Sequence, residues 1–323
     1  MANEQSFEQF FESELTPALQ PLEKQRKELV KKITITCGGI AIVAIVIAIF
    51  LIVNSANLML LLFFVIGSFA LGAFLIKRMS SEYVFSFKTL VVEPIIQYIS
   101  PDLTYSPKSG ISESRFRASE IFRHSIDRYH CEDLIQGPVE QTHINFSELH
   151  AEYKTESRDS KGHRQTNWHT IFKGLFFIAD FNKYFKGRTF VLPDSAEKLF
   201  GRFGQKIQEI GKSHGKLVKL EDPDFEREFA VYSTDQVEAR YILSPALMRR
   251  LLKFKNKTGE KVYFSFTGGE VNIGISSTKN RFEPKLFSTV LNIELAREFV
   301  EDLQMALDVV DDLNLNTRIW TKE

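Results

Sequence analysis

The chain has 323 residues, with 41 Lys plus Arg against 41 Asp plus Glu and a pI near 7.1. This length fits a membrane anchor followed by one or two soluble units. The equal charges give no global signal for nucleic acid or another polyanion, so we expect no nucleic-acid partner.

Residues 1–32 are predicted to form a cytoplasmic N-terminal arm. Its aromatic residues and one leucine make a single helical stripe: Phe7, Phe10, Phe11 and Leu15. Pro17 and Pro21 are expected to interrupt any regular helix there. The stripe could lie on the membrane or pack against the protein's own domain. The acidic residues around it disfavour anionic lipid, so we favour packing: Glu4, Glu8, Glu12 and Glu14.

Two long stretches, Ile33–Val53 and Leu58–Ile76, contain no charged residue. At a rise of about 1.5 Å per residue, each helix would span roughly 30 Å, the thickness of the hydrocarbon core of a bilayer. The polar link at residues 54–57 is so short that the helices must form an antiparallel hairpin. We therefore predict transmembrane helices at 33–53 and 58–76, joined by an external link. A cleavable signal peptide is rejected, because its apolar stretch would be shorter and nearer the N-terminus.

Small residues recur four apart in each stretch, at Ala44 and Ala48 and at Ser68 and Gly72. This spacing allows helix backbones to approach closely in lipid, although small residues are also simply common in membrane helices.

Basic residues flank the apolar stretches, and the link between them has none. Positive charge is retained on the cytoplasmic side of a membrane, which predicts that both termini are cytoplasmic. The same residues could hold anionic lipid headgroups, but topology alone explains them. The residues predicted to set the topology are Arg26, Lys27, Lys31, Lys32, Lys77 and Arg78.

Residues 77–323 are predicted to form a cytoplasmic α+β domain with a mainly antiparallel sheet. A helix is expected over 81–100, ended by Pro101. Strands are expected from His143 and over 168–181 and 188–192. In the first of them, the apolar residues change from one face of the strand to the other before Tyr153, which predicts a β-bulge at that change. The polar residues 154–167 are predicted to be a hairpin loop. The 29 Phe residues favour sheet and are expected to form its core.

Further along the chain, Asp194 with Glu197 resembles a capping box and predicts a helix to about residue 210. Strands are expected near 216–220 and 225–232, and Ser233 with Gln236 has capping-box spacing. Ser244 before a proline marks another helix start. Residues 261–276, with Gly268-Gly269 at the turn, predict a tight hairpin. A C-terminal amphipathic helix is predicted over 293–313, with an acidic outer face that could meet a basic partner or be solvated.

No constellation with reactive geometry is evident, so we predict no catalytic, cofactor-binding or metal-binding residues. His130, Glu132, His143 and His150 could in principle gather around a metal, and Cys131 could pair with a histidine as a nucleophile. Nothing in their spacing requires either arrangement. Two cysteines without a CxxC motif support neither a disulfide framework nor structural zinc.

Three long strings resemble a bacterial family known as domain of unknown function 3137: FKGLFFIADFNKYFKGRTFVLPD (172–194), FAVYSTDQVEARYILSPALM (229–248) and DLNLNTRIW (312–320). The resemblance implies a multi-pass protein of the bacterial inner membrane. It implies no activity, substrate or cofactor.

The function expected from these observations is a non-enzymatic, membrane-anchored interaction or regulatory module with a protein partner that the sequence does not identify. A membrane-surface lipid-binding domain and an enzyme of unrecognised type are the alternatives.

Overall fold

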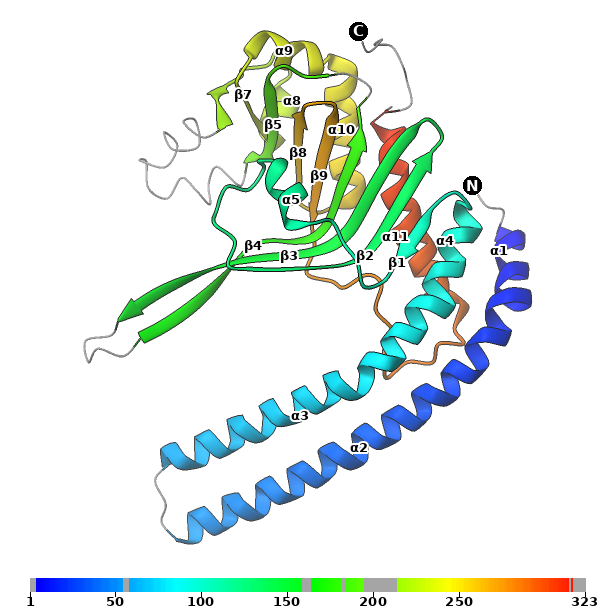
Figure 1. Ribbon diagram of the computed structural model, residues 1–323, viewed down its shortest axis with the longest axis vertical. Coiled ribbons are helices and arrows are strands. Elements are labelled where there is room, and N and C mark those ends of the chain that lie inside the picture. The colour runs from blue at the N-terminus through cyan, green and yellow to red at the C-terminus, as the bar shows by residue number, and fades with distance from the viewer. Residues whose placement is uncertain are drawn as a thin grey trace. The chain divides into compact units, whose positions relative to one another are not determined.

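The computed structural model describes residues 4–54, 58–158, 164–181, 184–194, 214–313 and 315 (Figure 1). The chain divides into two compact units. The first comprises residues 1–95 and 282–300, and the second comprises residues 96–281 and 301–323. The sequence-based boundaries at residues 32, 53, 57 and 76 stay a prediction.

Two long helical stretches make up most of the first unit. One runs through α1 (Glu4–Phe10), a π-helical turn (Phe11–Leu15) and α2 (Thr16–Val53). The other runs through α3 (Leu58–Phe87), a π-helical turn (Lys88–Val92) and α4 (Glu93–Ile99). α2 and α3 lie side by side (Figure 1). The helix predicted over 81–100 is therefore largely the continuation of the second apolar helix.

The expectation that Pro17 and Pro21 interrupt the helix is wrong. α2 begins at Thr16, which places Pro17 in its first turn, directly after the π-helical turn at Phe11–Leu15. Pro21 lies inside the helix. The regular α-helical hydrogen-bond pattern changes in the π-helical turn that directly precedes α2. In that turn the Thr16 N–H donates to the carbonyl five residues earlier, that of Phe11.

The aromatic stripe of the N-terminal arm is mostly buried. Phe7, Phe11 and Leu15 are all buried, and they continue into Leu19 and Leu22 of α2. Side chains from α3 and from the first part of α11 (Ile293–Asp312) are buried in the same unit, with the rings of Phe87 and Phe299 5.4 Å apart. The arm thus packs against the protein itself, as favoured from its acidic residues.

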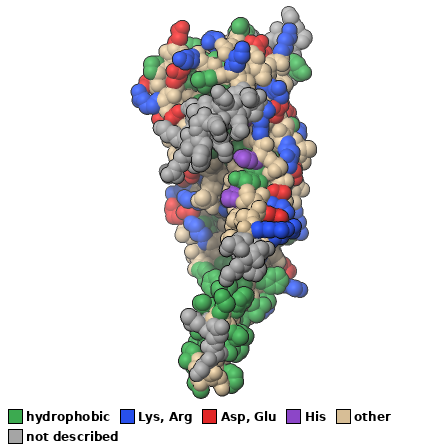
Figure 2. All heavy atoms as spheres, turned by 90° about the vertical axis from the view of Figure 1, so that its left-hand side faces the viewer, with side chains coloured by type: hydrophobic (Ala, Val, Ile, Leu, Met, Phe, Trp, Pro, Cys, Tyr) green, Lys and Arg blue, Asp and Glu red, His purple; other side chains and the backbone are tan. Residues whose placement is uncertain are grey.

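The apolar parts of α2 and α3 are exposed. Both helices are long and apolar enough to cross a membrane, and no residue of the most apolar stretch of either is buried. Figure 2 shows hydrophobic side chains covering the lower end of the molecule, where these two helices end. The exposed large hydrophobic residues include Ile42, Ile45, Val46, Ile49, Phe50, Leu62, Phe63, Ile66, Phe69 and Phe74.

An ion pair lies buried at the base of α2. The carboxylate of Glu23, which is only 4% exposed, accepts hydrogen bonds from the Arg26 guanidinium at 2.7 and 2.9 Å. Glu23 also accepts from the Val290 N–H at 3.1 Å, and Arg26 donates to the Leu286 carbonyl at 2.9 Å. The pair therefore joins residues 286–290 to the first part of α2. The Arg26 hydrogen bond is the main reason why the pKa of Glu23 is lowered to about 2.

The second unit is built on one antiparallel sheet, whose described strands follow the order β1-β2-β3-β4-β9-β8-β5-β7-β6. The strands are β1 (Thr104–Ser106), β2 (Arg128–Val139), β3 (Thr142–Arg158), β4 (Arg164–Asp180), β5 (Arg188–Pro193), β6 (Lys216–Leu217), β7 (Phe229–Ser233), β8 (Val262–Thr267) and β9 (Glu270–Ser276). With two long apolar N-terminal helices and this sheet, the chain is α+β, in agreement with the predicted class and the mainly antiparallel sheet.

Both faces of this sheet are covered. On one face, Phe116 of α5 (Glu113–Ala118) packs among Phe172, Phe176 and their neighbours. On the other face, Phe254 of α10 (Pro245–Thr258) and Phe229 contact Phe264. Most of the largest fully buried side chains are phenylalanines, which confirms that the Phe-rich strands form core.

β3 and β4 extend beyond the rest of the sheet as a two-stranded arm. Pairing of β2 with β3 ends at Arg128 and Glu152, and pairing of β4 with β9 begins at Gly174. Residues 153–158 and 164–169 pair only with each other, Thr170 pairs with Glu152 at their base, and Figure 1 shows this ribbon projecting from the sheet. Ile171 has no cross-strand partner at the base of the arm, which makes a β-bulge there. We call residues 153–158 and 164–170 the β-arm.

The β-arm corrects the prediction of a loop over 154–167. Its side chains are exposed on both faces, so no alternation of apolar and polar residues marks the strands. The predicted bulge in β3 also lies elsewhere. β3 pairs continuously with β4 up to Ala151, and the irregularity is on the facing strand β2, between Glu132 and Ile135.

Other local predictions can be compared with the structure directly. The hairpin of β8 and β9 and the α10 start, with Ser244 accepting from the Leu247 N–H, are confirmed. Residues 223–228 form α8 (Pro223–Glu228) rather than strand, capped by Asp222. The cap of α9 (Gln236–Ile242) is Asp235, not Ser233. The helix predicted after Asp194 lies outside the described residues.

We predict that Glu23→Gln destabilises the first unit, because it leaves the Arg26 charge buried without its partner. Breaking such a pair costs about 3–5 kcal/mol, so thermal unfolding of the detergent-solubilised chain should occur at clearly lower temperature. Glu28→Gln, an exposed change on the same helix, is the control and should unfold like the wild type. Because the folded pKa of Glu23 is lowered, its contribution is present above pH 4.5 and is lost as the pH falls toward 2. Equal unfolding temperatures for the two variants would contradict this role.

Candidate functional site

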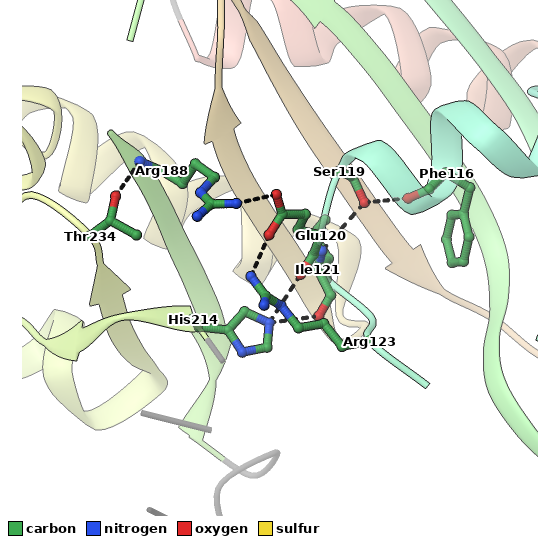
Figure 3. Close-up of polar contacts among 8 residues, drawn as sticks. All are labelled: Phe116, Ser119, Glu120, Ile121, Arg123, Arg188, His214 and Thr234. Carbon is green, nitrogen blue, oxygen red and sulfur yellow. Dashed lines mark hydrogen bonds and ion pairs between the residues drawn. The ribbon is translucent and has the colours of Figure 1, made fainter. Parts of the chain in front are cut away.

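The most connected polar cluster of the second unit surrounds His214, just before β6 (Figure 3). Only 6% of this residue is exposed. Its Nε2 lies 3.0 Å from the Glu120 carbonyl oxygen and 3.2 Å from that of Ile121. Carbonyl oxygens only accept, so Nε2 must carry the proton and donate, which assigns the tautomer of the neutral ring.

His214 is held in its neutral form by its surroundings. Its ring stands edge-on to Phe190 of β5, with centroids 4.7 Å apart and planes 86° apart. Burial lowers the pKa of His214, and the positive charge of Arg123 lowers that pKa further. A neutral imidazole of this kind can donate at Nε2 without introducing charge into the core.

Glu120 connects three segments around this histidine. Its carboxylate accepts from the side chains of both Arg123 and Arg188, while its carbonyl accepts from His214 (Figure 3). The backbone of Glu120 is left-handed, with φ of 53°, a conformation that costs a non-glycine residue roughly 1 kcal/mol or more. The three interactions hold the residue in that conformation.

The chemistry available in this cluster is that of a structural junction. The Ser119 hydroxyl donates to the Phe116 carbonyl at 2.7 Å and accepts from the Ile121 N–H (Figure 3). Arg188 donates its backbone N–H to the Thr234 hydroxyl at 2.9 Å. The Ser119 bonds therefore stabilise the 116–123 turn itself, and the Arg188 N–H joins β5 to Thr234. Glu120 joins the turn to β5 through Arg188 and to the segment at residue 214 through His214.

A second cluster brings three carboxylates together across β2 and β3. Ligand oxygens of Glu132, Asp133 and Glu148 lie within 4.8 Å of one another. Oxygen ligands of this kind suit a hard divalent cation such as Ca²⁺ or Mg²⁺. Asp133 is 0% exposed and accepts from the Tyr105 hydroxyl, and Glu148 accepts from the Arg281 N–H. These contacts give Asp133 and Glu148 partners within the chain.

The histidines considered for a metal site are only partly brought together. His130 and His150 are cross-strand neighbours, but His143 pairs with Pro138 near the far end of β3. The closest contact of His130 to a carboxylate is 3.5 Å, to Glu132. The cysteine beside them is not activated, because burial and the charge of Glu132 raise the pKa of Cys131 and keep it a thiol.

The basic residues predicted to set the topology differ in their surroundings. Arg26 belongs to the buried ion pair with Glu23, whereas Lys27 is largely exposed and 3.7 Å from the same carboxylate. The remaining four are exposed: Lys31, Lys32, Lys77 and Arg78. Arg26 therefore has a structural partner that its position in the sequence did not suggest.

Sequence reasoning did not find the His214 cluster or the three carboxylates. His214 meets Glu120 and Ile121 through backbone carbonyls, which carry no residue-specific signal. The one local hint is Gly215, which follows the histidine with φ of 99°, a conformation that favours glycine. Glu132 is among the residues considered above for a metal, but nothing in the sequence distinguishes Glu148 from the other residues of its strand.

Comparison with known proteins agrees with the resemblance seen in the sequence. Residues 170–315 match the family model described as "Protein of unknown function (DUF3137)". No curated protein matches. A solved structure, the mycobacterial trehalose monomycolate transport factor A, is similar to 63% of this chain and 88% of its own, with 7% identity and a TM-score of 0.30. So low a score and identity assign neither fold nor function.

We predict that His214→Leu loosens the 116–123 turn, because two buried carbonyls lose their donor, at a cost of about 1–3 kcal/mol. Hydrogen–deuterium exchange of peptides covering this turn should become faster. Since the folded pKa of His214 is lowered, the wild type should keep its protection above about pH 6.5 and lose part of it as the pH falls below that value. The leucine variant should lack this pH dependence. The exposed His143→Leu change is the control, and faster exchange in that variant alone would disprove the assignment.

Proposed function

We propose that this chain is a non-enzymatic interaction or regulatory module, anchored in a bacterial inner membrane by α2 and α3 with both termini in the cytoplasm. The observation that carries the proposal is the exposure of the apolar parts of both helices. Burying one large apolar side chain contributes about 1.5–3 kcal/mol. Leaving this whole surface in water would cost tens of kcal/mol, more than the roughly 5–15 kcal/mol by which proteins are stable.

Hydrocarbon is the surrounding that best fits these helices. A core helix of a soluble protein would be mostly buried, whereas neither apolar stretch is. The first apolar stretch also continues from a folded base, in which Glu23 and Arg26 form a buried ion pair, as expected of an anchor that is part of the fold. Exposed Lys31, Lys32 and Arg78 at the ends of the apolar stretches support cytoplasmic termini.

An interaction role is supported by the state of the candidate reactive groups. His214 donates to backbone carbonyls, Cys131 is kept as a thiol, and Asp133 and Glu148 have partners in the chain. These contacts stabilise the fold. The β-arm, by contrast, leaves two exposed faces for contact with another molecule.

The topology is tested with single cysteines in a Cys37→Ser, Cys131→Ser background. Ser55→Cys, in the link, should react with a membrane-impermeant maleimide on intact spheroplasts. Ser81→Cys, exposed after the second apolar stretch, should react only after permeabilisation. The protein should also stay in the membrane pellet through alkaline carbonate extraction. Release by carbonate would remove the anchor, and labelling of Ser81→Cys on intact spheroplasts would reverse the topology.

The interaction role is tested by affinity purification of the full-length chain from detergent-solubilised membranes after chemical crosslinking. One defined protein should be recovered reproducibly, and in lower yield with a variant that lacks residues 153–170. Repeated recovery of this chain alone would contradict a role as an interaction module. Equal yield from the two forms would locate the binding surface away from the β-arm.

A further inference from the structure

The two faces of the β-arm differ in charge. Cross-strand partners share a face, so the register places Tyr153 with His169, Thr155 with Asn167 and Ser157 with Gln165 on one of them. That face has no acidic or Lys and Arg side chains. The other face carries Lys154, Glu156, Arg158, Arg164 and Trp168. All five are exposed, and we call them, with Arg128 at the base, the cationic face.

Some basic side chains of the cationic face lie close to a carboxylate, and others do not. Near the base, Arg128 lies 3.2 Å from Glu152, and Lys154 lies 3.2 Å from Glu156. At the far end, Arg158 and Arg164 are direct cross-strand partners. Among the described residues, neither guanidinium forms an ion pair. Like charges placed directly opposite one another destabilise a ribbon. An anion bound between the two would remove this repulsion, and guanidinium matches phosphate oxygens in pairs.

An aromatic ring accompanies these cations. The indole of Trp168 is 40% exposed, and the Arg128 guanidinium lies over it, 3.9 Å from the ring centroid. This cation–π contact holds the ring on the cationic face. Tryptophan combines a large apolar body with one N–H group and is enriched where membranes meet water. Cations and an exposed indole on one surface therefore match the chemistry of a phospholipid interface.

We propose that the cationic face binds anionic phospholipid headgroups, with the phosphates held by Arg158 and Arg164 and the Trp168 ring at the interface. This inference rests on the proposed membrane anchor, which tethers the second unit, and with it the β-arm, to a bilayer. Nucleic acid is the other polyanion that arginine pairs recognise. The chain's equal numbers of acidic and basic residues and neutral pI favour lipid, because nucleic-acid-binding proteins are typically basic overall.

The chain contains a built-in reporter, since Trp168 and Trp320 are its two tryptophans. In a Trp320→Phe background, the emission of Trp168 is measured with the full-length protein in nanodiscs. Neutral nanodiscs contain phosphatidylcholine alone, and anionic nanodiscs contain phosphatidylglycerol as well. We expect emission at shorter wavelength, and quenching by brominated lipid, in the anionic nanodiscs. Raising the salt from about 0.1 to about 1 M should reverse the shift, because the Debye length falls from about 10 to about 3 Å.

Arg158→Gln with Arg164→Gln should abolish the shift. This double change also removes the cross-strand repulsion, so unfolding of the β-arm is not expected to explain the loss. Lys216→Gln with Arg249→Gln removes the same charge from exposed positions elsewhere in the chain and should keep the shift. Arg158→Lys with Arg164→Lys retains the charge and should keep most of it.

The outcomes separate this inference from the membrane anchor. If the protein does not co-purify with nanodiscs, the anchor itself is disproved. If it co-purifies but Trp168 emits alike in neutral and anionic nanodiscs, the lipid-binding β-arm is disproved while the anchor stands. Equal loss in the Lys216 and Arg249 variant would show general charge attraction and overturn the site. A shift in neutral nanodiscs on adding an oligonucleotide would overturn the assignment to lipid.

Discussion

The constraint on which the rest depends is that the apolar parts of α2 and α3 are exposed, although water solvates such a surface poorly. An α-helix satisfies its backbone hydrogen bonds internally, so its side chains alone decide which solvent it tolerates. Here the exposed side chains along the apolar parts of both helices include many large hydrophobic residues. The burial of side chains changes along each helix. Outside the apolar parts, Leu22 and Leu29 of α2 and Tyr83 and Phe87 of α3 are buried. The same helices thus belong to a folded base at one end and expose an apolar surface at the other.

Much of the fold could be predicted because its signals are local. The apolar stretches, the β8–β9 hairpin with glycine at its turn and the Ser244-Pro245 helix start each depend on residues close together in the chain. The β-arm could not be predicted, because a strand exposed on both faces has no apolar alternation. Phe225 misled for the opposite reason. It is buried in a short helix that directly precedes β7, so its position close to the apolar residues of β7 wrongly favours a strand.

The candidate site was beyond sequence reasoning for a different reason. His214 and Glu120 are 94 positions apart, and their contact uses a main-chain carbonyl that any residue could supply. The left-handed backbone of Glu120 is equally invisible, since most non-glycine residues avoid it. The three carboxylates meet only because the irregular pairing on β2 places Glu132 and Asp133 opposite Glu148. Contacts made by register and by backbone atoms need the folded chain to be seen.

The net charge of the chain is zero, but the charges are not evenly paired within it. The β-arm differs from the rest of the chain in this respect. Glu23 and Arg26 neutralise each other in the first unit. In the second unit, Lys257 of α10 lies 2.7 Å from Asp308 and 3.0 Å from Asp312, so part of the acidic face of α11 meets a basic helix of the same chain. The sequence allowed a basic partner for that acidic face, and Lys257 of the same chain supplies part of it. Arg158 and Arg164 differ from these pairs, because the register sets charge against like charge. An opposite or neutral residue would stabilise the ribbon more at this position, so the pair is consistent with the anion binding proposed for the cationic face.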